Sequence, residues 1–227
     1  MHAVPTILIT GAGRGIGLEL ARQYAADGWT VIGTVREAAA ARALTDIGAR
    51  AISLDVTDLA AVKRLPEQLH GAPLDVLFCN AGISGKRGMA LGSFDYGEWE
   101  KVLRVNLLGA AAVIEALVDN VAASTSKTIA VMSSRMGSIS GTTGATLPYS
   151  TSKAALNLLA RGLSATLAPR GVIVVALNPG WVKTDMGGAG APLSPRDSVR
   201  GLRRVLGSLR PQDSGKFLAH DATAIPW

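Results

Sequence analysis

Residues 149–153 read YSTSK, so a tyrosine and a lysine stand four residues apart directly after a proline. In a helix this spacing places the Tyr149 and Lys153 side chains on one face. A phenol has an ordinary pKa of about 10 and is a poor acid-base catalyst at neutral pH, whereas a nearby ammonium favours the phenolate. The pair therefore predicts a tyrosine that transfers protons and a lysine that tunes it, with the small residues at 150–152 leaving room for a ligand.

A tyrosine acid also requires a hydrogen-bond partner for the oxygen of its substrate. The stretch SSRMGS at 133–138 supplies hydroxyl groups for that purpose. A second polar group is Asn106, which interrupts the apolar stretch VNLLG at 105–109. An amide pointing inward there either repairs a distortion of a helix or holds a water molecule in a proton path.

The stretch TGAGRGIG at 10–17 follows an apolar run and contains the glycines of a turn that opens a helix. Backbone N–H groups and the helix dipole at such a turn can hold a pyrophosphate. The spacing is Gly-x-x-x-Gly-x-Gly, which differs from the common dinucleotide pattern Gly-x-Gly-x-x-Gly. Its place after a first predicted strand indicates a dinucleotide site and not an unliganded glycine turn.

The end of the next predicted strand selects the dinucleotide, because a carboxylate there accepts from the ribose of NAD and a basic group binds the 2′-phosphate of NADP. In TVREA at 34–38, Val35 occupies the position expected for the acid and Arg36 follows it. Arg14 is placed to reach the same phosphate, and arginine suits bidentate phosphate contacts. Glu37 favours NAD instead, but is interpreted as a residue of a first helical turn, stabilised by the helix dipole. NADP(H) is therefore the expected cofactor and NAD(H) the alternative.

The third strand end carries LDVTD at 54–58. The Asp55 carboxylate is suited to accept from an adenine amino group, with the Val56 backbone beside the ring. An aspartate here is also suited to cap the following helix. For Asp58 the cap is the favoured interpretation.

The stretch CNAG at 79–82 follows the fourth predicted strand. Its small residues allow the backbone to approach a ligand closely, and Asn80 is expected to tie neighbouring strand ends together. Cys79 is expected to be a small buried hydrophobic residue and not a nucleophile. After the sixth predicted strand, NPGWVKT at 178–184 provides a turn whose backbone is suited to hold a carboxamide, with Thr184 near it.

Short β-branched runs that alternate with helical patterns position these motifs along the chain. The predicted strands are 6–10, 30–35, 50–54, 74–79, 128–133, 172–177 and 215–219, with helices in the intervals. This alternation predicts an α/β protein with a seven-stranded parallel sheet covered on both faces, a single-domain doubly wound Rossmann fold over residues 1–227. Ligands of such folds bind outside the carboxyl ends of the strands, where the motifs stand. The glycine-rich stretch DMGGAGAPLSP at 185–195 is interpreted as a mobile lid, within a substrate-binding loop at 181–196.

The composition of the 227 residues, 48% hydrophobic and 18% charged, is sufficient for one large core. Cys79 is the only cysteine, and no Cys/His cluster has metal-ligand spacing, so we expect neither a disulfide nor a metal site. We expect a reducing, cytoplasmic setting for the same reason. The N-terminal stretch lacks the pattern of a leader, and no apolar run reaches the ~18 residues of a membrane span. Association with a membrane is therefore not expected.

The formal net charge is +6, and RGLRRVLGSLR at 200–210 is the densest basic stretch. Four apolar residues recur there at helical spacing: Leu202, Val205, Leu206 and Leu209. This pattern is typical of an amphipathic helix with a solvated basic face. Nucleic-acid binding is not expected, and a modest positive field suits a phosphate-bearing cofactor.

Taken in order, TGAGRGIG, LDV, CNAG, the asparagine at 106, SS, YSTSK and NPGWVKT resemble the short-chain dehydrogenase/reductase family over nearly the whole chain. The resemblance implies that Tyr149 is the general acid/base, and that Lys153 binds a ribose and lowers the pKa of the tyrosine. It implies that Ser134 holds the substrate oxygen and that Asn106 completes a proton relay. The residues expected to contact the dinucleotide are Gly11, Gly13, Arg14, Gly15, Ile16, Arg36, Asp55, Val56, Asn80, Ala81, Gly82, Tyr149, Lys153, Pro179, Gly180, Val182 and Thr184.

One position departs from the family pattern. The serine of the family usually stands about thirteen residues before the tyrosine, and that position is Met136, between Ser134 and Ser138. Ser134 is the preferred assignment and Ser138 the alternative. The ending SGKFLAHDATAIPW at 214–227 and the short length resemble the C-signal-factor and sniffer type of carbonyl reductases within the family.

The resemblance implies an NADP(H)-dependent oxidoreductase that acts on small aldehydes, ketones or alcohols. The main alternative is a catalytically silent signalling protein that binds the dinucleotide. An isomerase, dehydratase or epimerase is disfavoured because the chain has no extended substrate domain. The family usually associates, so a homodimer or homotetramer is expected through helices at about 93–120 and 150–168, where LLGAAAVIEALV is more apolar than one buried face requires.

Overall fold

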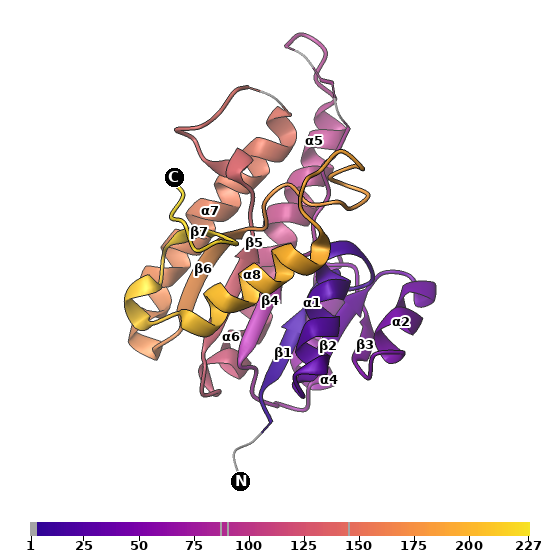
Figure 1. The fold of residues 1–227 in the computed structure, drawn as a ribbon, viewed down its shortest axis with the longest axis vertical. Coiled ribbons are helices and arrows are strands. Elements are labelled where there is room, and N and C mark those ends of the chain that lie inside the picture. Colours follow the sequence, from indigo (N-terminus) through magenta and orange to yellow (C-terminus); the bar gives the residue numbers. More distant parts are fainter. Residues whose placement is uncertain (1–3, 87, 90, 145) are drawn as a thin grey trace.

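The computed structural model describes residues 4–86, 88–89, 91–144 and 146–227. Seven parallel strands form one sheet in the order β3-β2-β1-β4-β5-β6-β7 (Figure 1). The strands are β1 Thr6–Ile9, β2 Thr30–Val35, β3 Arg50–Ser53, β4 Val76–Cys79, β5 Thr128–Met132, β6 Ile173–Asn178 and β7 Phe217–Ala219. Every strand expected from the sequence is present, and the largest differences are at β4 and β7, which begin at 76 and 217 instead of 74 and 215. The predicted single-domain, doubly wound α/β fold is confirmed.

Helices cover both faces of this sheet. The α-helices are α1 Gly15–Ala26, α2 Ala38–Thr45, α3 Leu59–Lys63, α4 Leu65–Gln68, α5 Tyr96–Leu103, α6 Gly109–Ala122, α7 Leu147–Leu167 and α8 Pro195–Ser208. A π-helical turn, η1 Arg104–Leu108, joins α5 to α6, and the 3₁₀ turns are η2 Arg135–Gly137, η3 Ala168–Arg170 and η4 Pro211–Asp213. Helices α1 and α8 pack side by side on one face (Figure 1).

Two apolar layers lie on opposite faces of the sheet. In β1, Ile7 and Ile9 belong to the layer under α1, α2 and α8, whereas Leu8 belongs to the layer under α3, α4, α6 and α7. Since both faces are buried, the strands read as continuous apolar runs and not as alternating ones. Cys79 lies in the second layer, and burial raises the pKa of its thiol to about 12. The expectation that Cys79 is a small buried hydrophobic residue is confirmed.

The connections that follow the strands gather at one end of the molecule. The segments between β4 and α5, between β5 and α7 and between β6 and α8 all lie at the end above the sheet (Figure 1). The motifs at 79–82, 133–138 and 178–184 stand on these connections, and those at 10–17, 34–38 and 54–58 stand at the ends of β1, β2 and β3. A parallel sheet therefore brings residues from six strand ends to one edge.

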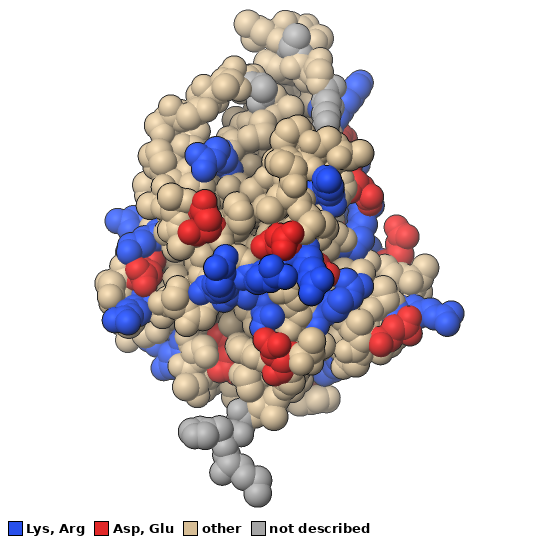
Figure 2. Space-filling view, in the orientation of Figure 1, with Lys and Arg blue, Asp and Glu red and all other residues tan. Residues whose placement is uncertain are grey.

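Helix α8 confirms the amphipathic interpretation of residues 200–210. Leu202, Val205 and Leu206 are buried, while Lys and Arg side chains form a band across the face of α8 and α1, with Asp and Glu among them (Figure 2). Ion pairs join Arg200 to Asp197 and Arg203 to Asp27. The basic face is thus partly neutralised.

Two further observations bear on the boundaries of the predicted elements. Helix α8 begins at Pro195, so the expected substrate-binding loop at 181–196 ends two residues earlier, at Ser194, whose side chain caps the helix. No helix within the described ranges is both long and apolar enough to cross a membrane.

Candidate active site

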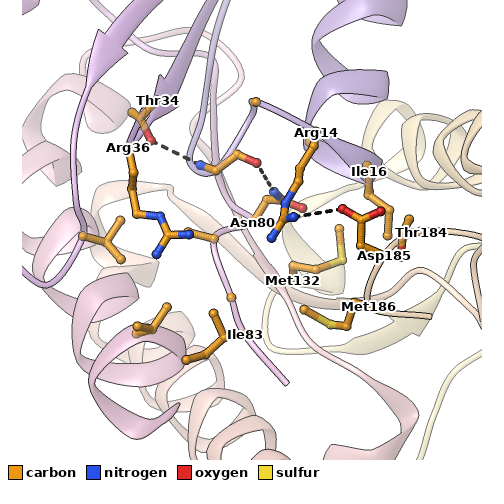
Figure 3. A pocket seen from close by; sticks show the side chains of 18 of the residues that line it. Arg14, Ile16, Thr34, Arg36, Asn80, Ile83, Met132, Thr184, Asp185 and Met186 are labelled. Atoms are coloured by element: carbon orange, nitrogen blue, oxygen red, sulfur yellow. Dashed lines mark hydrogen bonds and ion pairs between the residues drawn. The ribbon is translucent and has the colours of Figure 1, made fainter. Parts of the chain in front are cut away.

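A cavity of about 560 Å³ opens at the carboxyl end of the sheet (Figure 3). It runs from the glycine-rich loop (residues 10–17) past the ends of β2, β3 and β4 to the first turns of α7. The predicted residues that line it are Gly11, Gly13, Arg14, Gly15, Ile16, Arg36, Asp55, Val56, Asn80, Ala81, Gly82, Tyr149, Lys153, Pro179 and Thr184. Gly180, Val182, Ser134 and Asn106 were also predicted and do not line it, and Val182 is buried in a bridge with Leu193.

The first turn of α1 faces this cavity without a cap of its own. Arg14, the N-cap residue, has extended backbone and makes no side-chain cap hydrogen bond, and no acidic residue stands in the first turn. The N–H groups of that turn have no intrahelical acceptors, and the helix dipole favours negative charge there. This end of the cavity fits the pyrophosphate of a dinucleotide.

The glycine-rich loop is held against β4 by Asn80. Its Nδ2 donates to the carbonyl oxygens of Thr10 and Gly11, both at 3.0 Å. In return, Thr10 Oγ1 accepts from the backbone N–H groups of Asn80 and Ala81 at 3.0 Å. The prediction that Asn80 ties neighbouring strand ends is confirmed.

Arg36 and Glu37 lie together at the end of β2. Arg36 is exposed and points into the cavity (Figure 3), and none of the residues that the structure describes forms an ion pair with it. Glu37 was expected in a first helical turn, and that expectation is wrong: it is the extended N-cap residue of α2, it makes no cap hydrogen bond, and it lines the cavity. Both an arginine and a carboxylate are thus available at this end.

Asp55 and Asp58 behave differently although they are three residues apart. Asp58 Oδ1 accepts from the N–H of Ala61 at 3.0 Å, so the predicted cap of α3 is confirmed. Asp55 Oδ1 accepts from the backbone N–H and the hydroxyl of Thr57, at 2.8 and 2.7 Å. These hydrogen bonds, together with the charge of Arg36, hold the pKa of the Asp55 carboxyl below its ordinary value. Asp55 is therefore an ionised acceptor on the cavity wall.

Tyr149 and Lys153 occupy successive turns of α7. Lys153 Nζ lies 5.6 Å from the centroid of the Tyr149 ring, so the prediction that both side chains share one face is confirmed. Lys153 Nζ donates to the carbonyl oxygen of Met132, at the end of β5, at 2.6 Å. Burial lowers the pKa of Lys153 to about 8.

The balance at Tyr149 differs from what the family resemblance implies. Burial raises the pKa of the Tyr149 phenol, and a hydrogen bond with the Ser134 side chain lowers it by a smaller amount. The net direction is upward, because removing a phenolate from water costs more free energy than this one hydrogen bond returns. Lys153 lies over the ring of Tyr149, but the pKa of the phenol is still raised.

The structure distinguishes between the two candidate serines. Ser134 is the residue hydrogen-bonded to Tyr149, and its Oγ also accepts from the N–H of Met136 at 3.2 Å. The Ser138 hydroxyl is buried and donates to the carbonyl oxygen of Pro226 at 2.6 Å. Ser138 thus holds the C-terminal segment, and Ser134 is the serine beside the phenol.

Asn106 is fully buried at the π-helical turn η1, which is a distorted segment of the kind that its polar side chain predicted. Its Oδ1 accepts from the N–H of Ile83 at 2.8 Å, and its Nδ2 donates to the Ile83 carbonyl and to Ser152 Oγ, both at 2.9 Å. A Cβ on Gly82 would lie 3.2 Å from Asn106 Oδ1 and 3.5 Å from Lys153 Nζ. Asn106 and Lys153 therefore flank the same backbone.

The three small residues between the tyrosine and the lysine do not line the cavity, so the expectation that they leave room for a ligand is wrong. Ser152 is fully buried and donates to the Tyr149 carbonyl. Thr151 donates to the Leu147 carbonyl and accepts from Trp99 Nε1 at 3.0 Å. Their small size serves the packing of α7 against α5 and η1.

Several residues that sequence reasoning missed also line the cavity. They are Gly17, Thr34, Val35, Glu37, Ala40, Leu54, Ile83, Val105, Met132, Ser133, Lys183, Asp185 and Met186. Most of them directly follow or precede a residue that was identified, so position at a strand end was the available signal. Asp185 had been assigned only to the predicted lid.

The fold and the cavity define a class: an α/β oxidoreductase with a dinucleotide site at the carboxyl edge of a doubly wound parallel sheet and a tyrosine–lysine pair on the helix after β5. The sequence model described as short chain dehydrogenase matches residues 5–191. The chain belongs to the short-chain dehydrogenase family.

Individual relatives agree with this membership. The chain is 43% identical over 156 residues to C-signal of Myxococcus xanthus. This match covers 68% of this chain and 93% of C-signal. Carbonyl reductase Sniffer of D. melanogaster is similar in structure with a TM-score of 0.90 and 31% identity, over 99% of this chain and 100% of that one. An NADPH bound carbonyl reductase from chicken fatty liver is similar with a TM-score of 0.91 and 31% identity, over 99% of both chains.

The burial of Lys153 makes the stability of the protein depend on pH. Its folded pKa of about 8 lies below the ordinary 10.5, so between these values the folded protein binds fewer protons than the unfolded chain. The free energy of unfolding should therefore rise with pH across this window, by about 3 kcal/mol at about 1.4 kcal/mol per pKa unit.

Urea denaturation at pH values below and above the window measures this rise. Lys153→Met should abolish the contribution, while Lys63→Met, at an exposed position of α3, should retain it. Subtracting the rise in the free energy of unfolding of Lys153→Met from that of Lys63→Met cancels the contribution of all other titrating groups. An equal rise in both variants would show that Lys153 is not the group responsible.

Proposed function

We propose that this protein is an NADP(H)-dependent oxidoreductase that interconverts small aldehydes or ketones and the corresponding alcohols. The observation that carries the proposal is the arrangement along one cavity. Tyr149, which is hydrogen-bonded to Ser134, and Lys153 line one end, and Arg36 and the uncapped first turn of α1 stand at the other. The similarity to an NADPH bound carbonyl reductase supports the same cofactor and reaction for this chain.

In this proposal Ser134 and Tyr149 both donate hydrogen bonds to the carbonyl oxygen of the substrate. The nicotinamide, when bound, supplies hydride to the carbonyl carbon. The Tyr149 hydroxyl gives its proton to the oxygen, which completes the alcohol, and the reverse transfers oxidise an alcohol. Since burial raises the pKa of Tyr149, the phenol is protonated at neutral pH, which suits the reduction.

Lys153 supports the step in which the phenol loses its proton. With a pKa of about 8 it is mostly an ammonium at neutral pH, and it lies 5.6 Å from the centre of the ring. A positive charge at this distance favours the phenolate that forms during reduction. Asn106 acts through the backbone of Ile83, which it holds beside Gly82 and the lysine, and we assign it a positioning role in the proton relay.

The first test concerns proton transfer. Tyr149→Phe removes the transferable proton while preserving most of the ring, so turnover of a carbonyl substrate should fall by about a hundredfold or more. NADPH affinity should change little. Ser134→Ala should also lower turnover, whereas Ser138→Ala, the matched control, should leave it nearly unchanged because its hydroxyl contacts Pro226.

A panel of aldehydes, ketones and alcohols, followed by nicotinamide absorbance, measures these rates. Turnover that survives intact in Tyr149→Phe would refute the assignment of the proton donor. A larger loss in Ser138→Ala than in Ser134→Ala would transfer the role to Ser138.

The second test concerns the cofactor. Arg36 points into the cavity and forms no ion pair with any described residue, so it is assigned to the 2′-phosphate. The charged hydrogen bonds of a phosphate–arginine contact contribute about 1.5–3 kcal/mol. Arg36→Asp should therefore weaken NADPH binding by about ten- to a hundredfold and reverse the preference over NADH.

Fluorescence titration with each reduced dinucleotide checks this expectation. Arg42→Asp in α2 is the matched control, since it changes the charge equally at a position that does not line the cavity. Its NADPH affinity should stay within about twofold of the unaltered protein. Equal or tighter NADH binding by the unaltered protein would contradict the assignment, in which case Glu37 becomes the candidate acceptor for a ribose.

A third proposal concerns assembly into a homodimer or homotetramer. Leu158 on α7 and Leu108, the last residue of η1 before α6, are 74% and 53% exposed, which supports association through these helices. Leu158→Glu should convert the oligomer into a monomer in light scattering at micromolar concentration. Leu59→Glu, at an equally apolar exposed position of α3, should not, and a monomeric unaltered protein would contradict the proposal.

The similarity to C-signal favours a second candidate function, that of a signalling protein that binds the dinucleotide without turnover. The complete set of Ser134, Tyr149, Lys153 and Asn106 weighs against catalytic silence. Tight NADPH binding with no turnover on the whole panel would favour the signalling function.

We propose for either function that residues 181–194 act as the substrate-binding lid. We also propose that the protein works in the cytoplasm, since its single cysteine is a buried thiol.

A further inference from the structure

Arg14 does not point toward Arg36, with which it was expected to share a phosphate. Its Nη1 lies 2.9 Å from Asp185 Oδ2, and Figure 3 shows the guanidinium turned toward Asp185 on the opposite side of the cavity from Arg36. Both Arg14 and Asp185 line the cavity. The ion pair therefore joins the glycine-rich loop to the segment between β6 and α8 across the cavity that is assigned to the cofactor.

The segment that carries Asp185 has a folded base of its own. Lys183 and Leu193 are joined by a backbone hydrogen bond of 2.9 Å, and Trp181 Nε1 donates to the Gly187 carbonyl at 2.8 Å. Thr184 lies close to the glycine-rich loop, since a Cβ on Gly15 would be 3.4 Å from its methyl group. The ion pair thus adds a charged contact between two segments that already lie close together at Gly15 and Thr184.

The Arg14–Asp185 pair is also easy to exchange. The two side chains are 76% and 78% exposed, and an ion pair at that exposure contributes about 0–1 kcal/mol. A phosphate group carries more negative charge than a carboxylate and accepts from both arms of a guanidinium. A 2′-phosphate within reach of the Arg14 guanidinium would therefore displace Asp185 from it, whereas the pyrophosphate is assigned to the N–H groups of the first turn of α1.

We propose that Asp185 is a specificity-determining residue that competes with the 2′-phosphate of the cofactor for Arg14. The inference rests on the proposed function, since it requires NADPH in this cavity. NADPH draws Arg14 away from Asp185, whereas NADH, which lacks the phosphate, leaves the pair intact. Asp185 thus lowers the preference for NADPH that two arginines would otherwise give, and it links recognition of the phosphate to the segment at 181–194.

A double-mutant cycle tests the competition. The variants are Asp185→Asn, Arg14→Gln and the combination of both, and the readout is the Kd for NADPH and for NADH from fluorescence titration of the reduced dinucleotide. Asp119→Asn is the matched control, because Asp119 also forms an exposed ion pair with an arginine, Arg170, and its loss changes the net charge equally.

Asp185→Asn should tighten NADPH binding by about three- to fivefold, the range that release of an exposed ion pair allows, and NADH binding by less than about twofold. In the Arg14→Gln background the same change should have no effect on NADPH beyond that seen with NADH. Asp119→Asn should leave both affinities unchanged.

Four results would overturn this inference alone: weaker NADPH binding in Asp185→Asn, unchanged NADPH binding in Asp185→Asn, an equal gain for both dinucleotides, or an undiminished gain in the Arg14→Gln background. Absence of NADPH binding by the unaltered protein would overturn it together with the proposed function.

Discussion

The rest of the site depends on one packing constraint: the first turn of α1 lies in direct contact with the loop that follows β1. A Cβ on Gly17 would lie 2.4 Å from the Gly11 carbonyl oxygen and 2.6 Å from Asn80 Nδ2, so only glycine allows the first helical turn to lie against the loop and the end of β4. Asn80 then fixes the loop by donating to Thr10 and Gly11. The unpaired N–H groups of α1 consequently face the cavity, and the helix dipole points at whatever anion enters it.

At the other end of the cavity, burial sets the protonation of the reacting groups. The same loss of water raises the pKa of Tyr149 and lowers the pKa of Lys153, since both shifts favour the uncharged forms. Hydrogen bonds from Ser134 and to Met132 partly compensate for that loss. Asn106, which lies on the other side of Gly82 from Lys153, is satisfied by Ile83 and Ser152, and it occupies the one π-helical turn in the described part of the chain. A buried polar cluster of this kind requires partners from several elements at once.

Sequence reasoning was wrong where a side chain had two chemically reasonable surroundings. Residues 150–152 are small, and small residues suit either a ligand or a close helix; they pack against α5 and η1. Glu37 was expected within a helical turn, but α2 begins one residue later and leaves its carboxylate at the cavity. Arg14 suited a phosphate on chemical grounds, and no local pattern indicated that Asp185, 171 residues away, would take its guanidinium. The errors at residues 150–152 and at Arg14 concern partners that are distant along the chain, whereas the error at Glu37 concerns the boundary of a helix.

By itself the sequence determined the fold class, the position of every strand to within two residues, and the shared face of Tyr149 and Lys153, because local periodicity and turn chemistry act over a few residues. It also identified the role of Asn80 and the cap at Asp58. Only the tertiary structure decided that Ser134 and not Ser138 meets the phenol, that burial outweighs the hydrogen bond at Tyr149, and that Arg14 pairs with Asp185. Burial and long-range contacts depend on how the sheet brings distant segments to one edge, and that arrangement exists only once the chain has folded.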